Sequence, residues 1–212
     1  MDLGQQRLPQ RGKSTVLLTL LVLSTLALSS LATVGHASET RVRLETSMGN
    51  ITLKLYPEKA PITVANFLSY VDSGHYDGTI FHRVISNFMI QGGGFDTDFV
   101  EKPTNDPIPN ESKNKLHNIR GSIAMARTSD PDSAGAQFFI NQRSNLRLDW
   151  APGKPGYTVF GEVVDGMGVV DFIAVSKTGP ALATTSAGRA PMNDVPVEPV
   201  ILKRAVRVTT ID

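Results

Sequence analysis

Two runs of alternating apolar and polar residues predict a β-hairpin over residues 41–56. The alternating apolar positions are Val42, Leu44, Ile51, Leu53 and Leu55. Between the two runs, residues 47–50 have the sequence Ser-Met-Gly-Asn, which suits a tight turn. Because successive side chains of a strand point to opposite faces, each arm of the hairpin would bury one face.

Two segments have apolar residues at helical spacing instead. Over residues 63–73 these positions are Val64, Phe67, Leu68 and Val71. Pro61 can open this helix and Gly74 can end it. A second helix is predicted within residues 165–176, with Val169, Val170, Ile173 and Ala174 on one side.

The rest of the chain alternates between short apolar runs and polar, proline-containing segments. Strands are predicted at 121–126, 136–140, 157–163 and 200–208. Loops are expected at 96–120, 127–135 and 145–156. Residues 178–199, which are rich in Gly, Ala, Ser, Thr and Pro, are expected to form a mobile excursion. Many short strands with only two helices indicate an all-β barrel or sandwich.

The stretch 79–94 places three reactive or polar side chains, His82, Arg83 and Gln91, among aromatic and aliphatic residues. A buried, unpaired cation is costly, so we expect Arg83 to have partners or to line a cleft. If the stretch is extended throughout, Phe81 and Arg83 share one face. The glycines that follow, 92–94, permit a turn and close backbone approach.

Composition narrows the possible functions. The 212 residues suffice for one domain with a sizeable core, and 41% hydrophobic and 19% charged residues argue against disorder. A net charge of +1 gives no indication of nucleic-acid binding. The absence of cysteine excludes disulfides, thiolate nucleophiles and thiolate zinc sites. His75, His82 and His117 lack metal-ligand spacing, so no metal or other cofactor is predicted.

Residues 1–37 have the parts of a secretory signal peptide. Three basic residues precede an apolar, leucine-rich run over 16–32, and Gly35 and Ala37 supply small residues for cleavage. We therefore expect an exported protein whose mature part, residues 38–212, is one domain. The apolar run is also near the minimum length for crossing a bilayer, so an uncleaved anchor is the alternative.

Five segments, in order along the chain, resemble the signature of cyclophilin-type peptidyl-prolyl cis-trans isomerases. They are Phe81-His82-Arg83-Val84-Ile85, Phe88-Met89-Ile90-Gln91-Gly92-Gly93, Gly121-Ser122-Ile123-Ala124-Met125-Ala126, Gln137-Phe138-Phe139-Ile140 and Val159-Phe160-Gly161-Glu162-Val163. The resemblance implies an all-β fold, a closed eight-stranded antiparallel β-barrel capped by two α-helices. With the export signal, the chain is similar to bacterial periplasmic cyclophilins.

This resemblance implies an enzyme that accelerates the isomerisation of X–Pro bonds in exported proteins. Its partners would be proline-containing polypeptides, with no nucleic acid, no membrane after signal cleavage, and a monomeric state. The reaction removes no proton and forms no covalent intermediate. It needs a pocket that grips the proline ring and a group that favours the twisted amide.

By the same resemblance, Arg83 is the catalytic residue. The residues expected to bind substrate are Phe88, Met89, Gln91, Ala126, Arg127, Thr128, Gln137, Phe139, Leu148 and Tyr157. The apolar ones, Phe88, Met89, Phe139 and Leu148, would form the proline pocket. Gln91 would hold Arg83 or contact the peptide, residues 126–128 would form a rim, and Gln137 would hydrogen-bond the peptide.

The chain departs from the family pattern at three positions. The rim reads Ala126-Arg127-Thr128 where the family usually has Ala-Asn-Ala. Arg147 precedes Leu148 where eukaryotic members carry a tryptophan, and Tyr157 stands where they often have a histidine. If the rim binds through its backbone, catalysis should tolerate the first departure.

A binding module and a hydrolase are the alternatives to an isomerase. A binding module that grips proline-containing peptides without catalysis would not require Arg83. A hydrolase would need an activated nucleophile, and Ser133, His82 and Asp132 form a triad only by assumption. His82 fits a buried scaffold role, and the glycines 92–94 lack the following lysine of a phosphate loop.

Overall fold

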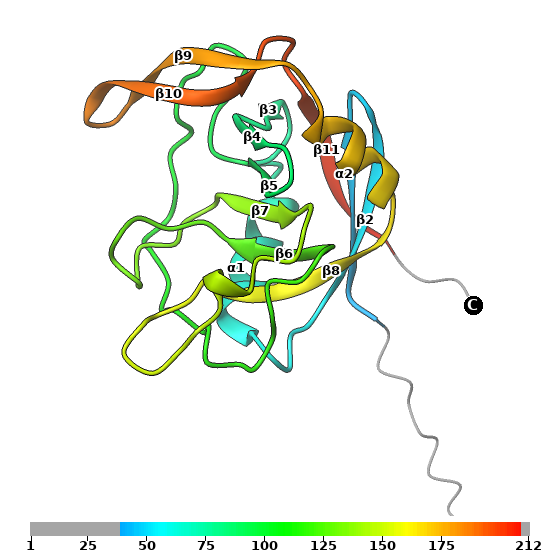
Figure 1. Ribbon diagram of the computed structural model, residues 1–212, viewed down its shortest axis with the longest axis vertical. Helices are drawn as coiled ribbons and strands as arrows, with labels where there is room; N and C mark the ends of the chain where they lie inside the picture. Colours follow the sequence, from blue (N-terminus) through cyan, green and yellow to red (C-terminus); the bar gives the residue numbers. More distant parts are fainter. Residues whose placement is uncertain (1–38, 209–212) are drawn as a thin grey trace, which may run out of the picture. The chain divides into compact units, whose positions relative to one another are not determined.

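The computed structural model describes residues 39–208, so the predicted signal segment lies outside the described residues. A nine-stranded antiparallel sheet dominates this part of the chain (Figure 1), and two α-helices pack against it. The strands of the sheet, in spatial order, are β3 (Thr79–Ile80), β11 (Ile201–Val208), β1 (Arg41–Thr46), β2 (Gly49–Leu55), β8 (Val159–Asp165), β6 (Ser122–Met125), β7 (Phe138–Asn141), β5 (Met89–Gly92) and β4 (Arg83–Ile85).

The closed eight-stranded barrel implied by the resemblance is not what the ladders form. The sheet is open, with β3 and β4 at its two ends. Both end strands come from one stretch, interrupted by Phe81 and His82. The backbone N–H of Phe81 still bonds Val200 on the β11 side, whereas Arg83 pairs with β5. Because only two residues separate the ends, the sheet must curl round on itself.

The predicted hairpin is confirmed as β1 and β2, which pair in register from Arg41 opposite Lys54 to Thr46 opposite Gly49. Both predicted helices are also present, as α1 (Pro61–Asp72) and α2 (Met167–Ala174). Pro61 occupies the first turn of α1, as expected from its fixed φ.

One core fills the inner side of the curled sheet. Its largest buried side chains include aromatic rings that contact one another, Phe67 with Phe138 at 5.7 Å and with Phe160 at 5.1 Å. Phe67 belongs to α1, so the helix fixes its apolar face on the sheet through these rings. Val170 and Ile173 of α2 are buried in the same cluster.

The segment expected to be a mobile excursion is instead an antiparallel hairpin, β9 (Thr178–Thr185) and β10 (Gly188–Pro196), which Figure 1 shows beside β3 and β4. Ala183 of β9 is fully buried with Ile80 and Phe95. Thr184 also exchanges backbone hydrogen bonds with Phe99 and Glu101. Small side chains allow this close contact. The same small residues have little strand preference, so the composition did not predict a strand.

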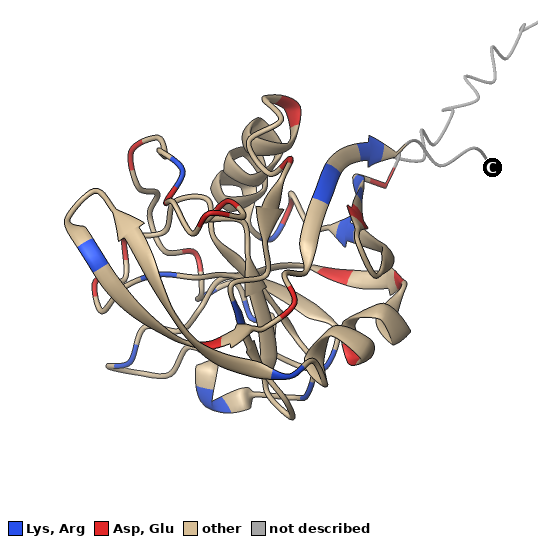
Figure 2. Cartoon of the chain, turned by 90° about the horizontal axis from the view of Figure 1, so that it is seen from above, with Lys and Arg blue, Asp and Glu red and all other residues tan. Residues whose placement is uncertain are grey.

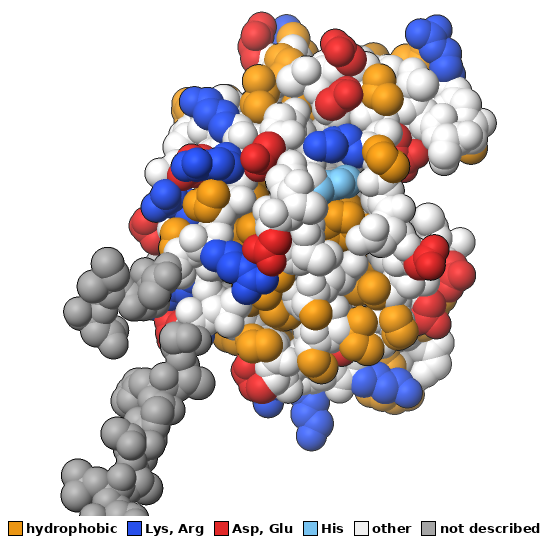
Figure 3. Space-filling model, turned by 180° about the vertical axis from the view of Figure 1, so that it is seen from behind, with side chains coloured by type: hydrophobic (Ala, Val, Ile, Leu, Met, Phe, Trp, Pro, Cys, Tyr) orange, Lys and Arg blue, Asp and Glu red, His pale blue; other side chains and the backbone are white. Residues whose placement is uncertain are grey.

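Lys and Arg residues are interspersed with Asp and Glu residues along the elements (Figure 2). On the face in Figure 3, hydrophobic side chains lie among polar and charged ones. None of the helices between Glu39 and Val208 has the length and apolar character that a bilayer crossing requires.

Candidate active site

The strand register brings the predicted site residues together. Arg83 of β4 lies opposite Gln91 of β5, which lies opposite Phe139 of β7, which lies opposite Ala124 of β6. Directly opposed residues share a face of the sheet. The alternate row, Val84, Ile90 and Ile140, faces the main core. One face of these strands therefore builds the core and the other builds a site.

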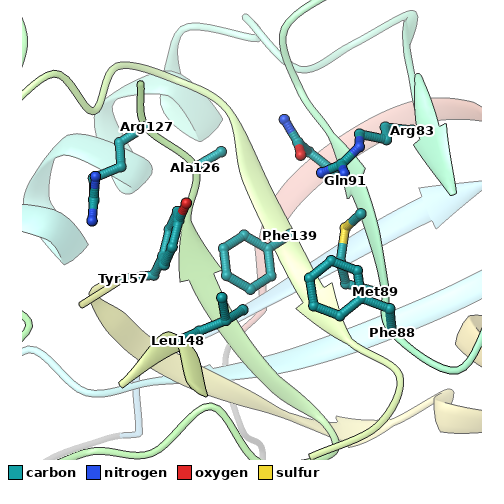
Figure 4. A pocket seen from close by; sticks show the side chains of 9 residues that line it. All are labelled: Arg83, Phe88, Met89, Gln91, Ala126, Arg127, Phe139, Leu148 and Tyr157. Atoms are coloured by element: carbon teal, nitrogen blue, oxygen red, sulfur yellow. The ribbon is translucent and has the colours of Figure 1, made fainter. Parts of the chain in front are cut away.

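A cavity of about 250 Å³ opens on this second face (Figure 4). It is lined by Arg83, Phe88, Met89, Gln91, Ala126, Arg127, Phe139, Leu148 and Tyr157, all of which the sequence had suggested. Arg83 and Gln91 stand on one wall, Tyr157 and Arg127 on the opposite wall, and Phe139 lies between them.

The floor and one wall of the cavity are apolar. Met89 and Phe139 are buried in a small cluster with Ala124 and Val159. The Phe139 ring meets the Tyr157 ring edge-on at 5.6 Å, and the Arg127 guanidinium lies 4.5 Å from the Tyr157 centroid. Such packing restrains the Phe139 and Tyr157 rings.

Arg83 is the cation on the same wall of the cavity as Gln91. None of the ion pairs and side-chain hydrogen bonds within residues 39–208 involves its guanidinium. Arginine keeps its charge and carries five directed N–H donors. At this half-buried place on the cavity wall, those donors are available to a bound molecule.

Gln91 holds Gln137 rather than Arg83. Its side-chain Nε2 donates to Gln137 Oε1 at 2.9 Å and lies 3.4 Å from His82 Nε2. Gly94 makes room for this pair, because a Cβ there would lie 2.5 Å from Gln137 Cγ. Gly93 has φ +85°, a turn conformation that favours glycine. The glycines thus serve close approach and a turn.

His82 is buried beside this network. Burial lowers the pKa of its imidazole to about 4, and its ring packs edge-on against Phe95 at 4.8 Å. A histidine that is neutral across the physiological range and packed on an aromatic ring fits the predicted scaffold role.

Thr128 and Gln137, the two remaining predicted residues, line an adjacent hollow of about 240 Å³. It shares Gln91, Ala126 and Arg127 with the first cavity, so the two are continuous. The other lining residues, Glu101, Thr104, Ser133, Gly135 and Ala136, were not predicted from the sequence. They come from two irregular segments whose contact no periodicity reveals.

The loop that carries Leu148 is tied down by Asp149. The Asp149 carboxylate accepts the Asn118 backbone N–H at 2.7 Å and lies 2.8 Å from His117 Nδ1. Burial alone would raise the pKa of Asp149, but these hydrogen bonds outweigh it and lower the pKa. The ionised carboxylate thereby holds Leu148 and, through the Tyr157 N–H to Leu148 C=O bond, the opposite wall.

Residues 41–206 match the sequence model described as cyclophilin type peptidyl-prolyl cis-trans isomerase/CLD. The chain belongs to this family. It is 50% identical over 168 residues to peptidyl-prolyl cis-trans isomerase A of Dickeya dadantii, covering 79% of this chain and 84% of that protein. It is 54% identical to cyp18 of Streptomyces antibioticus, covering 77% and 96%.

A solved cyclophilin from Cryptosporidium parvum, crystallised in the presence of the dipeptide Ala-Pro, has a similar fold. The TM-score is 0.64 at 26% identity, over 80% of this chain and 99% of that one. With the family and the relatives established, this cyclophilin is a peptidyl-prolyl cis-trans isomerase. Six of the nine lining residues of the cavity lie on the segments that carried the resemblance, and Arg127, Leu148 and Tyr157 lie outside them.

Proposed function

We propose that this cyclophilin isomerises X–Pro bonds of exported polypeptides, and that Arg83 stabilises the twisted amide in the proline pocket. The observation that carries the proposal is the position of Arg83, without a carboxylate partner in residues 39–208, on the wall of a cavity that also exposes Phe88, Met89, Phe139 and Leu148. Peptide binding alone would not need a cation at this place.

The chemistry follows from amide resonance. Twisting the X–Pro bond removes the overlap between the prolyl nitrogen and the carbonyl, which is the origin of the barrier of about 20 kcal/mol. As overlap is lost, the nitrogen regains a basic lone pair. An N–H of Arg83 directed at that nitrogen interacts more strongly with the twisted amide than with the planar one, and such a difference lowers the barrier.

The apolar residues hold the proline ring while the bond rotates. Phe88, Met89, Phe139 and Leu148 give part of the cavity an apolar lining, which matches the three ring methylenes of proline. Gln137 fits the role of binding the peptide chain beside the ring. Because its oxygen already accepts from Gln91, its Nε2 is left to donate to a substrate carbonyl.

The exported setting rests on residues 1–37. Their basic start, apolar run and small-residue site support secretion and cleavage, and we infer from them a mature enzyme in the periplasm. The expected mature chain begins at Ser38. A mass spectrum of the exported protein that matched all 212 residues would contradict cleavage.

An assay on a short X–Pro peptide tests the arginine mechanism. Loss of one charge-assisted hydrogen bond in the transition state predicts that Arg83→Ala lowers kcat/KM roughly 10- to 100-fold. Arg189→Ala is the matched control, since Arg189 of β10 lines neither the cavity nor the adjacent hollow and also has no ion pair within residues 39–208. Near-full activity of a folded Arg83→Ala variant would refute the role, and peptide binding without catalysis by the unaltered enzyme would leave only a binding module.

A further inference from the structure

The arginines of residues 39–208 fall into two groups. Five of the ten form ion pairs, and none of these five lines the proline pocket. They are Arg41, Arg43, Arg120, Arg204 and Arg207. Of the remaining five, Arg83 and Arg127 line the pocket and Arg147 stacks on the ring of Phe88, one of its walls. Positive charge without a carboxylate partner thus gathers at the pocket.

Arg147 is the exposed member of this group. It belongs to the short 3₁₀ helix η1 (Leu146–Leu148), directly before the pocket residue Leu148. Its guanidinium carbon lies 4.8 Å from the centroid of the Phe88 ring. Stacking uses the flat face of a guanidinium and leaves the N–H groups at its edge available for a carboxylate.

The neighbours of Arg147 add to its charge instead of cancelling it. Lys154 Nζ donates to the Arg147 carbonyl oxygen at 2.5 Å, which brings a second cation to the same rim. Asp149 is the only acid of the loop 145–156, and its two oxygens are engaged by Asn118 and His117.

Arg127, on the opposite wall, is placed differently. Its guanidinium donates to the backbone carbonyls of Thr128, Pro155 and Gly156. The fork of donors that could bind a carboxylate in a bidentate way is therefore already used there. Arg147, which makes no such bonds within the described residues, is the better carboxylate receptor.

We propose that Arg147 gives this enzyme a preference for substrates with an aspartate or glutamate next to the isomerising proline. The inference rests on the proposed proline pocket. A proline ring held between Phe88 and Leu148 brings its flanking side chains to the residue that stacks on one wall and adjoins the other. A carboxylate there meets an oriented guanidinium, whereas a lysine meets two like charges.

Matched peptides test the preference. Two series carry Glu, Gln or Lys immediately before or immediately after the proline, and Glu and Gln have nearly the same size. At low ionic strength we expect kcat/KM for the Glu peptide to be about two- to fivefold higher than for the Gln peptide in at least one series. This is the range expected from one exposed ion pair. The ratio should fall as NaCl is added, because salt screens exposed charges.

Variants assign the effect to its residue. Arg147→Gln should bring the Glu-to-Gln ratio to about one, and Arg147→Lys should retain part of it. Arg189→Gln removes an equally unpaired charge from the hairpin and should leave the ratio unchanged. No preference in either series, or a preference that survives in Arg147→Gln, would overturn the inference. Failure to turn over the Gln peptides would instead refute the proposed function.

Discussion

Phe138 and Phe139 face opposite sides of β7. Phe138 is fully buried in the main core, edge-on to Phe67, Tyr76 and Phe81. Phe139 belongs to the pocket cluster. Alternation along a strand predicts this division from the sequence alone, and the structure confirms it. Phe81 and Arg83 would share a face only if residues 79–94 were extended throughout, and they do not share one.

The error at Phe81 has a local cause. The stretch is not extended throughout, because the backbone leaves the β11 ladder after Phe81 and joins β5 at Arg83. The break lets Phe81 enter the core while Arg83 faces the pocket. A change of strand partner depends on distant residues, so no local pattern could reveal it.

His82 makes stability depend on pH. Burial lowers its pKa to about 4, below the value of about 6.5 in the unfolded chain. Between these values the unfolded chain binds more protons at this position, so stability decreases as pH falls through the window. At pH 4 this lowers the free energy of unfolding by about 3 kcal/mol.

Urea unfolding at pH 7 and pH 4.5 measures this dependence. His82→Gln should lose less stability than the unaltered protein between the two pH values, whatever its stability at pH 7. Subtracting the loss of one protein from that of the other removes the contribution of His75, whose pKa burial also lowers. Equal losses in the two proteins would show that His82 does not take up the proton.

At the scale of elements, α1 depends on a residue far along the chain. Ala60 precedes the helix and gives no side-chain cap. The Glu111 carboxylate takes that place, accepting the backbone N–H of Ile62 at 3.2 Å and of Thr63 at 2.8 Å. It also accepts the hydroxyl of Thr63 at 2.7 Å. A negative charge at a helix N-terminus is favourable as well.

Glu111→Ala should therefore destabilise the protein by about 1–2 kcal/mol, the usual cost of a lost N-cap. For a protein of this size, that corresponds to a decrease in Tm of roughly 2–8 °C in a thermal melt. Glu58→Ala is the control, since Glu58 is exposed and makes no side-chain hydrogen bond within the described residues. A melting temperature of Glu111→Ala equal to that of the control would contradict the capping role.

The elements also mark the limit of sequence reasoning. Strands and helices with strong periodicity, such as β1, β2 and α1, were predicted within a few residues. The hairpin β9–β10 was missed, because its pairing depends on Ala183 packing against Ile80 and Phe95. Small residues carry little local preference, so tertiary contacts decide their structure.

At the scale of the molecule, the site depends on segments brought together by the curled sheet. Pocket residues come from β4, β5, β7 and the loops that contain Ala126, Leu148 and Tyr157. Family resemblance, rather than periodicity, predicted this set. The adjacent hollow was not predicted in full, because residues 101–104 and 133–137 meet only in the folded chain.

The fold of the whole molecule also explains how Arg83 can act on a bound proline. The cavity presents apolar side chains to the proline ring, and strand β4 holds the Arg83 donors beside them. The cavity and Arg83 therefore have separate roles. The cavity determines how tightly proline is held, and Arg83 determines how fast the held bond rotates.

NMR exchange on a saturating X–Pro peptide measures these two roles separately, as a dissociation constant and an on-enzyme rate of interconversion. For Arg83→Ala we predict an on-enzyme rate roughly 10- to 100-fold lower, with much less change in affinity. The on-enzyme rate of Arg83→Lys should lie between those of Arg83→Ala and the unaltered enzyme, because lysine keeps the charge but lacks the directed donors of arginine. An unchanged on-enzyme rate with weaker binding would contradict the account, since Arg83 would then only hold the substrate.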